Sequence, residues 1–173
     1  MEEKKSLETI RPDIASLPFP SEEEEMAGLA RIKQGDADAA EAFKKMNLRY
    51  VATVAFQHLG QGLTLDELIE GGNQGLMVAA NEYTGSVKRS FVEYAIWRVR
   101  KGILYAIAAA QSGNEEPFEV AVYKLTERER EVIHSFNEGK SAAEIAESMK
   151  IPESLVTLLY RRGNRKLDHQ KKE

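Results

Sequence analysis

The chain has 173 residues, 42% of them hydrophobic and 30% charged, which is the balance of a globular protein with one or two small domains. It has no cysteine, which excludes a disulfide framework and a thiolate metal site. The longest apolar run, residues 102–110, is about half as long as a bilayer requires, and no apolar signal segment follows the start. We therefore expect a cytoplasmic protein without a membrane partner.

The net charge of −4 comes entirely from residues 1–46, which carry 7 Lys and Arg against 11 Asp and Glu. Proteins that bind DNA unaided are usually basic, because neutralisation of phosphates drives their affinity. Any role on nucleic acid therefore requires a partner that supplies most of the positive charge.

The first 20 residues show no helical periodicity and contain Pro12, Pro18 and Pro20. We expect a flexible leader over residues 1–20. The following residues differ, because Ser21 and Glu24 form a capping box, which predicts the start of a helix. Gly35 predicts the end of that helix.

Helices dominate the rest of the chain. One is predicted from Asp36 to about Leu59. Four more capping boxes follow, at Thr64/Glu67, Ser90/Glu93, Thr126/Glu129 and Ser141/Glu144. They predict helices over 65–83, 90–111, 125–137 and 141–149, and a last helix starts near Pro152. Because no segment alternates with period 2, the pattern predicts an all-α protein.

Residues 112–124 are acidic and contain Gly and Pro, which predicts a linker between two helical domains, 21–111 and 125–173. In the second domain a short helix, a tight turn and a longer helix are typical of a helix-turn-helix with a basic tail. A plain helical hairpin is the alternative.

The helix predicted from Ser90 contains the only tryptophan and has two unlike faces. At about 100° per residue its apolar face holds Ala95, Val99, Gly102, Ile103 and Ala106. The other face is predicted to carry Phe91, Tyr94, Trp97, Arg98, Lys101 and Tyr105. Exposed rings among cations suit stacking on unpaired bases beside phosphates. The alternative is a central helix buried on both sides, with its cations reaching the surface.

Three motifs resemble the second region of bacterial RNA polymerase sigma factors: NLRYV at 47–51, LIEGGNQGLM at 68–77 and FVEYAIWRVR at 91–100. LTERE at 125–129 and the helix-turn-helix resemble their fourth region. The third region, a helical domain in the family, is missing. Family members commonly have two adjacent tryptophans, and here the second is Arg98.

The resemblance implies a sigma factor that binds core RNA polymerase and directs promoter recognition and −10 strand opening in transcription initiation. The partners it implies are the clamp coiled-coil of the largest polymerase subunit, the polymerase flap and promoter DNA. Helix 65–83 would dock on the clamp. The implied polymerase contacts on this helix are Glu67, Glu70, Asn73 and Met77.

The resemblance also implies two DNA contacts. For the unpaired −10 strand the implied residues are Arg89, Phe91, Tyr94, Trp97, Arg98, Arg100, Lys101 and Tyr105. For the −35 element they are Glu153, Ser154, Thr157, Leu158, Arg161, Arg162 and Arg165. The early members of the second set lack the Arg, Asn or Gln that suit bidentate base contacts, and its arginines come late, where phosphates or an acidic partner surface fit better.

Two other functions remain open. A sigma-like protein that binds core RNA polymerase or an anti-sigma factor without productive DNA binding is favoured by the weak base-reading helix. A plain helix-turn-helix regulator would leave residues 21–111 without a role. His58, His134 and His169 lack metal-ligand spacing, so we expect no metal. The glycines at 71–75 lack the Gly-Lys-Ser/Thr ending of a phosphate loop, and no Ser or acidic group has an evident base partner, so we expect no cofactor and no enzyme activity. We also expect a monomer.

Overall fold

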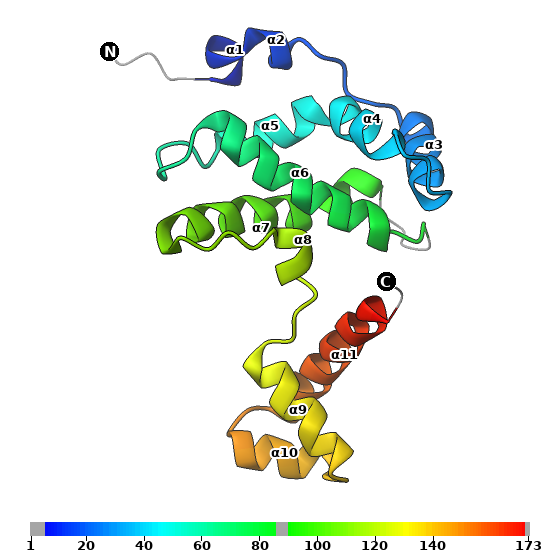
Figure 1. Cartoon of the computed structure of the whole chain (residues 1–173), viewed down its shortest axis with the longest axis vertical. Coiled ribbons are helices and arrows are strands. Elements are labelled where there is room, and N and C mark those ends of the chain that lie inside the picture. Colours follow the sequence, from blue (N-terminus) through cyan, green and yellow to red (C-terminus); the bar gives the residue numbers. More distant parts are fainter. Residues whose placement is uncertain (1–5, 86–89, 172–173) are drawn as a thin grey trace. The chain divides into compact units, whose positions relative to one another are not determined.

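The computed structural model describes residues 6–85 and 90–171, and these residues form helices and no strands (Figure 1). The all-α prediction is confirmed. All five predicted capping boxes are formed. The chain divides into two compact units between Glu119 and Val120. In chain order the helices are α1 (Leu7–Ile10), α2 (Pro12–Ala15), α3 (Glu22–Lys33), α4 (Ala39–Met46), α5 (Leu48–Phe56), α6 (Leu65–Glu82), α7 (Phe91–Ser112), α8 (Phe118–Ala121), α9 (Glu127–Asn137), α10 (Ala142–Met149) and α11 (Glu153–Gln170).

The centre of the first unit is the pair α6 and α7, which pack backbone against backbone. A Cβ on Gly75 would lie only 2.8 Å from the Cα of Val99, and one on Gly71 would lie 2.8 Å from the Cβ of Ala106. Each glycine inside a helix costs about 1 kcal/mol relative to alanine. The close approach of α7 explains why α6 nevertheless contains them.

The N-terminal segment corrects one prediction, because residues 6–20 are not a flexible leader. They contain α1 and α2, and Leu7 and Ile14 are buried in the hydrophobic core of the first unit. Pro12 occupies the first turn of α2, where a missing N–H leaves no helical hydrogen bond unmade. Two one-turn helices are too short to show a period, so the prolines alone suggested an irregular chain.

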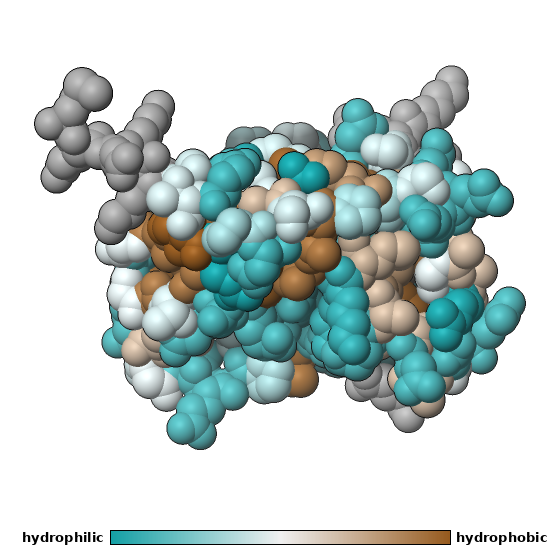
Figure 2. All heavy atoms as spheres, turned by 90° about the horizontal axis from the view of Figure 1, so that it is seen from above, coloured by the Kyte–Doolittle hydropathy of each residue, from teal (hydrophilic) through white to brown (hydrophobic). Residues whose placement is uncertain are grey.

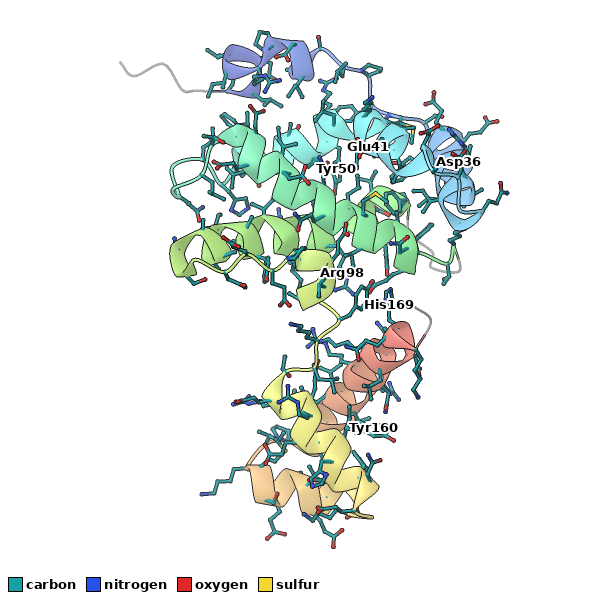
Figure 3. All side chains as sticks on the ribbon, in the orientation of Figure 1. Asp36, Glu41, Tyr50, Arg98, Tyr160 and His169 are labelled. Atoms are coloured by element: carbon teal, nitrogen blue, oxygen red, sulfur yellow. The ribbon has the colours of Figure 1, made fainter. Side chains whose placement is uncertain are left out.

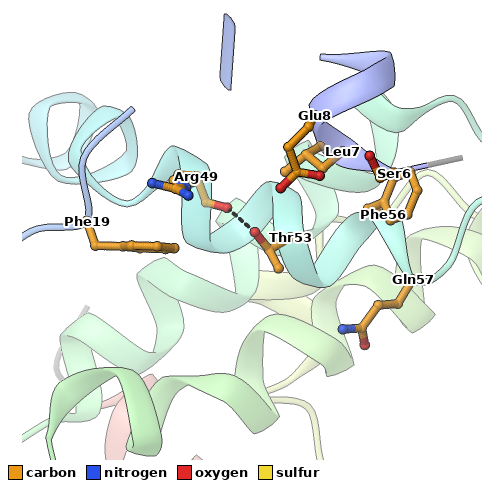
Figure 4. A pocket seen from close by; sticks show the side chains of 8 residues that line it. All are labelled: Ser6, Leu7, Glu8, Phe19, Arg49, Thr53, Phe56 and Gln57. Carbon is orange, nitrogen blue, oxygen red and sulfur yellow. Dashed lines mark hydrogen bonds between the residues drawn. The ribbon is translucent and has the colours of Figure 1, made fainter. Parts of the chain in front are cut away.

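A pocket of about 420 Å³ lies where this N-terminal segment meets α5 (Figure 4). The guanidinium of Arg49 is 4.3 Å from the centroid of the Phe19 ring, and its Nη1 donates to the carbonyl of Leu17 at 2.8 Å. These contacts help to hold the segment on α5.

Hydrophilic side chains cover most of the face seen in Figure 2, with apolar side chains showing between them.

The helix predicted from Asp36 to Leu59 is two helices, α4 and α5, which meet at Asn47. Asn47 is fully buried, and its Nδ2 donates to the carbonyl of Phe43 at 3.1 Å. The backbone N–H of Asn47 donates to the same carbonyl at 3.1 Å, so two bonds hold Asn47 at the end of α4, where the chain turns inside the core. No glycine or proline marks the break, so the apolar pattern appeared continuous.

The predicted linker, residues 112–124, does not run freely along its whole length. Helix α7 continues to Ser112 and ends at Gly113, whose φ is 68°. Phe118 is 5% exposed, and its N–H donates to Oε1 of Gln74 on α6 at 3.0 Å. One buried aromatic side chain thus anchors the middle of the segment, despite its acidic composition.

The second unit contains the predicted helix-turn-helix in α10 and α11, supported by α9. Its core is built from Val132, Ile145, Val156 and Leu159. The turn contains Lys150 with φ 54° and is followed by Pro152 at the start of α11. This confirms the helix-turn-helix geometry.

Candidate nucleic-acid and polymerase interface

The outer surface of α7 exposes a large aromatic ring beside cations. Trp97 is 63% exposed and Leu104, two turns further on, is 49% exposed. Lys101 lies between them in sequence and is also exposed. The guanidinium of Arg100 is 5.8 Å from the centroid of the Trp97 ring, within the range of a cation–π contact. Such a surface can stack a base and contact a phosphate.

Phe91 does not belong to this surface, and its predicted exposure is wrong. The side chain is 2% exposed and lies 5.3 Å from the Phe43 ring and 5.5 Å from the Tyr83 ring, both edge-on. Phe91 precedes Ala95 by four residues, so helical geometry places the two on the same buried face. Phe91 is therefore a residue of the hydrophobic core.

The flank of α7 next to α6 carries Tyr94 and Arg98, both half-buried. Arg98 forms an ion pair with Glu82, the last residue of α6, with 2.6 Å between Nη2 and Oε2. The Tyr94 hydroxyl donates to the same oxygen at 3.4 Å. The predicted phosphate contact of Arg98 is at odds with this geometry, because its charge is already neutralised within the protein.

Tyr105 is also engaged within the first unit. Its hydroxyl donates to the carbonyl of Glu116 at 2.9 Å and accepts from Nδ2 of Asn114 at 2.9 Å. Its ring centroid is 5.5 Å from that of Phe118. Tyr105 therefore fastens the segment after α7, rather than presenting an open ring. Arg89, predicted to contact DNA, lies outside the described residues.

The polymerase contacts predicted on α6 divide into two groups. Glu67 and Glu70 are exposed, and Glu67 also accepts the N–H of Thr64 in its capping box at 2.8 Å. Asn73 is half-buried, and its Oδ1 is a buried atom without a hydrogen-bond partner. Met77 is only 9% exposed and packs inside the unit, which corrects its prediction as a contact.

A further carboxylate lies near this face. Burial raises the pKa of Glu119, the charge of Lys44 opposes that rise, and the charge of Glu70 adds to it. Lys44 also pairs with Glu41 on α4. Glu41, Glu70 and Glu119 thus lie around Lys44, so acidic groups outnumber the cation beside this part of α6, which suits a basic partner surface.

Among the residues that the structure describes, no three His, Asp or Glu side chains are grouped so that they could hold a metal ion. No helix in that part of the chain is long and apolar enough to cross a membrane.

Comparison with known proteins decides the family. Residues 43–113 match the family model of sigma-70 region 2, and residues 121–169 match that of sigma-70 region 4. The chain belongs to the sigma-70 family. The region 2 match contains α5, α6 and α7, and the region 4 match contains α9 to α11. Only residues 114–120 separate the two matches, which leaves no room for a third helical region between them.

The chain is 30% identical over 146 residues to the RNA polymerase sigma factor SigA of Listeria monocytogenes, and 31% identical over 142 residues to SigA of Clostridium acetobutylicum. The alignments cover 83% and 81% of this chain but 39% and 38% of those relatives. The chain thus spans about two fifths of the length of the sigma factors it matches.

In region 4 the predicted DNA-reading residues occupy the exposed side of α11. Leu158 is 48% exposed, and Thr157 donates its hydroxyl to the carbonyl of Glu153 at 3.2 Å. The other members of the set are also exposed: Ser154, Arg161, Arg162 and Arg165. An exposed leucine and threonine suit apolar contact with thymine methyl groups, and the later arginines suit phosphates.

Sequence reasoning missed two ion pairs in this sigma chain. Glu82 pairs with Arg98 in region 2, and the buried Glu129 pairs with Lys166 in region 4, with 2.7 Å between Nζ and Oε2. The partners are 16 and 37 residues apart. No local spacing signals pairs this distant, and only the helix packing brings them together.

Proposed function

We propose that this chain acts as an RNA polymerase sigma factor in the bacterial cytoplasm. It binds core RNA polymerase through the exposed carboxylates of α6 and directs promoter recognition and −10 strand opening. The observation that carries the proposal is the exposed Trp97 ring beside Arg100, on a helix whose opposite face is fully packed. The chain acts without a cofactor and without covalent chemistry, as a monomer on the polymerase.

The net charge of the chain indicates which partner supplies the affinity for DNA. The net charge of −4 does not favour binding to DNA unaided, since phosphate contacts need cations. Core RNA polymerase supplies that affinity, and α7 supplies the stacking surface for unpaired bases. Region 4 adds contacts at the −35 element through α11.

The decisive experiment follows the single tryptophan. The chain is produced with a red-shifted tryptophan analogue at position 97, so that its emission is separable from that of the polymerase. It is mixed with core RNA polymerase and a forked duplex carrying an A/T-rich unpaired −10 strand. Base stacking is expected to quench the emission, and a run-off transcript is expected from the matching double-stranded template.

A matched pair of variants tests the surface itself. Trp97→Ala should lower run-off transcription about fivefold or more, since stacking of one base is worth about 1–3 kcal/mol. Phe19→Ala removes another exposed ring of the same unit, 56% exposed and outside α7. It should leave transcription unchanged. Equal losses in both variants would contradict the role of Trp97.

Docking is tested separately. Glu70→Arg combined with Asn73→Ala should abolish binding to core RNA polymerase while leaving the helical circular dichroism unchanged. Glu23→Arg makes the same charge change at an exposed position of α3 and serves as the control. Unchanged affinity in the double variant would remove α6 as the docking helix.

A second function is favoured by one observation, the neutralisation of Arg98 by Glu82. A chain with a weakened hold on DNA suits an interaction protein that occupies core RNA polymerase, or an anti-sigma factor, without opening promoters. A stable complex with core RNA polymerase that shows neither quenching nor transcript would establish this alternative.

A further inference from the structure

Glu82 holds the guanidinium of Arg98 inside the first unit. Arg98 is labelled in Figure 3. Nε and Nη2 of Arg98 both donate to Oε2 of Glu82, at 3.0 and 2.6 Å, and the hydroxyl of Tyr94 donates to the same oxygen at 3.4 Å. The two side chains of the ion pair are only 22% and 14% exposed. Separating them would leave a poorly hydrated carboxylate without its cation, which is costly.

Trp97, the residue before Arg98, is exposed instead of being held against α6. Trp97 is 63% exposed, and Arg100 lies over its ring rather than in an ion pair among the described residues. One residue further on, the side chain of Arg98 turns back to α6. Helix α7 therefore exposes the Trp97 ring, while the Arg98 guanidinium is held against α6 by Glu82.

We propose that Glu82 is a positioning residue that keeps Arg98 off the DNA backbone, and this role rests on the sigma function proposed above. It thereby weakens the sequence-independent hold of α7 on nucleic acid. Phosphate contacts are alike at every sequence, so a withheld cation reduces binding everywhere on DNA. The contact that α7 keeps is base stacking at Trp97, which only an unpaired strand allows.

A purely structural role for the pair predicts something different. If Glu82 and Arg98 served only to join α6 and α7, their removal would change the stability of the first unit and leave the salt dependence of DNA binding alone. A released Arg98 that reaches a phosphate adds one counterion-releasing contact. That contact steepens the plot of log affinity against log salt by about 0.7 for a single strand.

The test uses the full chain with core RNA polymerase and a dye-labelled forked duplex with an A/T-rich unpaired strand. Fluorescence anisotropy gives the affinity over a series of salt concentrations. Glu82→Gln keeps the shape of the side chain and removes its charge. We expect about threefold tighter binding at low salt and a slope steeper by about 0.7.

Two controls separate the release of Arg98 from the mere loss of a negative charge. Glu23→Gln removes one charge from an exposed position of α3, in the same unit but outside both the docking helix α6 and the proposed DNA surface of α7. Its slope should equal that of the wild type. In an Arg98→Met background, Glu82→Gln should no longer steepen the slope, because the cation that would reach the phosphate is gone.

The outcomes are distinct. An unchanged slope in folded Glu82→Gln, or a slope that stays steep in the double variant, overturns the role of Glu82. Should Glu82→Gln fail to fold, Arg98→Met decides alone: an unchanged slope supports the withheld cation, and a slope shallower by about 0.7 overturns it. Failure of the wild-type complex to bind the fork would instead overturn the sigma function itself.

Discussion

Gly75 of α6 lies directly against the backbone of Arg98 on α7, and a Cβ at Gly75 would lie 2.6 Å from the carbonyl carbon of Arg98. The same region of α7 thus meets α6 twice, through its backbone at Gly75 and through the Arg98 side chain at Glu82. The contact sets how far α7 stands from α6, and therefore whether the guanidinium can reach the carboxylate.

Gly75→Ala is expected to destabilise the first unit by about 3 kcal/mol, because a backbone neighbour cannot move aside as a side chain can. Urea unfolding followed by Trp97 fluorescence measures this, since the only tryptophan lies in that unit. Asn81→Ala, at an exposed position of the same helix, should change stability by less than about 0.5 kcal/mol. A wild-type midpoint for Gly75→Ala would show that α7 can shift freely.

Phe91 and Trp97 should respond to truncation in opposite ways. Phe91→Ala empties a core position between Phe43 and Tyr83 and should cost about 3–5 kcal/mol. Trp97→Ala removes an exposed ring and should cost less than about 0.5 kcal/mol. Urea unfolding followed by far-ultraviolet circular dichroism compares the two directly. The reverse order would mean that α7 is rotated about its axis.

The raised pKa of Glu25 predicts that the first unit loses stability as pH rises. Burial, and then the charge of Glu22, raise the pKa of Glu25 from its ordinary value of 4.5 to about 7. The folded chain therefore holds this proton more tightly than the unfolded chain does. The resulting stabilisation is complete below about pH 4.5 and is lost as pH rises through about 7.

Glu25→Gln removes this dependence, because an amide does not titrate in that range. Between pH 5 and pH 8 the wild type should lose about 1–2 kcal/mol relative to the variant, with solvent screening holding the figure below the full value of the pKa difference. Urea unfolding at both pH values measures it. Glu23→Gln, an exposed neighbour, should follow the wild type, and a Glu25→Gln profile parallel to the wild type would contradict the assignment.

Lys166→Met should destabilise the second unit by about 3 kcal/mol, because it leaves the buried Glu129 carboxylate without its cation. Adding Glu129→Gln should recover most of the loss, since no charge then remains buried. Hydrogen exchange of amides in α9 and α11 measures this unit, because Trp97 does not report on it. A double variant no more stable than Lys166→Met would show that packing of the lysine stem matters more.

The same pair gives the second unit the opposite pH response to Glu25. Burial acts to raise the pKa of Glu129, but hydrogen bonds from Lys166 and Thr126 and the lysine charge hold it below its ordinary value. Its contribution to stability is therefore present above about pH 4.5 and is lost as pH falls below that value. The amides of α9 should lose protection on acidification.

Local sequence predicted the helices well wherever a capping box marks their start. Each box needs only two side chains three residues apart, and its bonds form within one turn, so distant chain does not alter it. Asn47 shows the limit of this approach. The break between α4 and α5 falls at a fully buried side chain that bonds to Phe43, and burial is a property of the assembled core.

The candidate site was predicted in outline and corrected in detail. The sequence pattern marked α7 as a helix with rings and cations, and Trp97 is exposed as expected. It could not show that Phe118 folds back beside Tyr105. It could not show that Met77 is buried within the unit either, because those contacts join segments far apart in the chain.

The sequence by itself determined the all-α class, the five capped helices, the helix-turn-helix and the motifs of two sigma regions, because these rest on neighbours within a few residues. Only the tertiary structure decided which cations of α7 face outward. Glycines at the crossing of α6 and α7 let the two backbones touch, and that closeness brings Glu82 within 2.6 Å of Arg98 across 16 residues of chain. Arg98 counts as a cation in the sequence, but helix packing places its guanidinium against Glu82 instead of on the open surface.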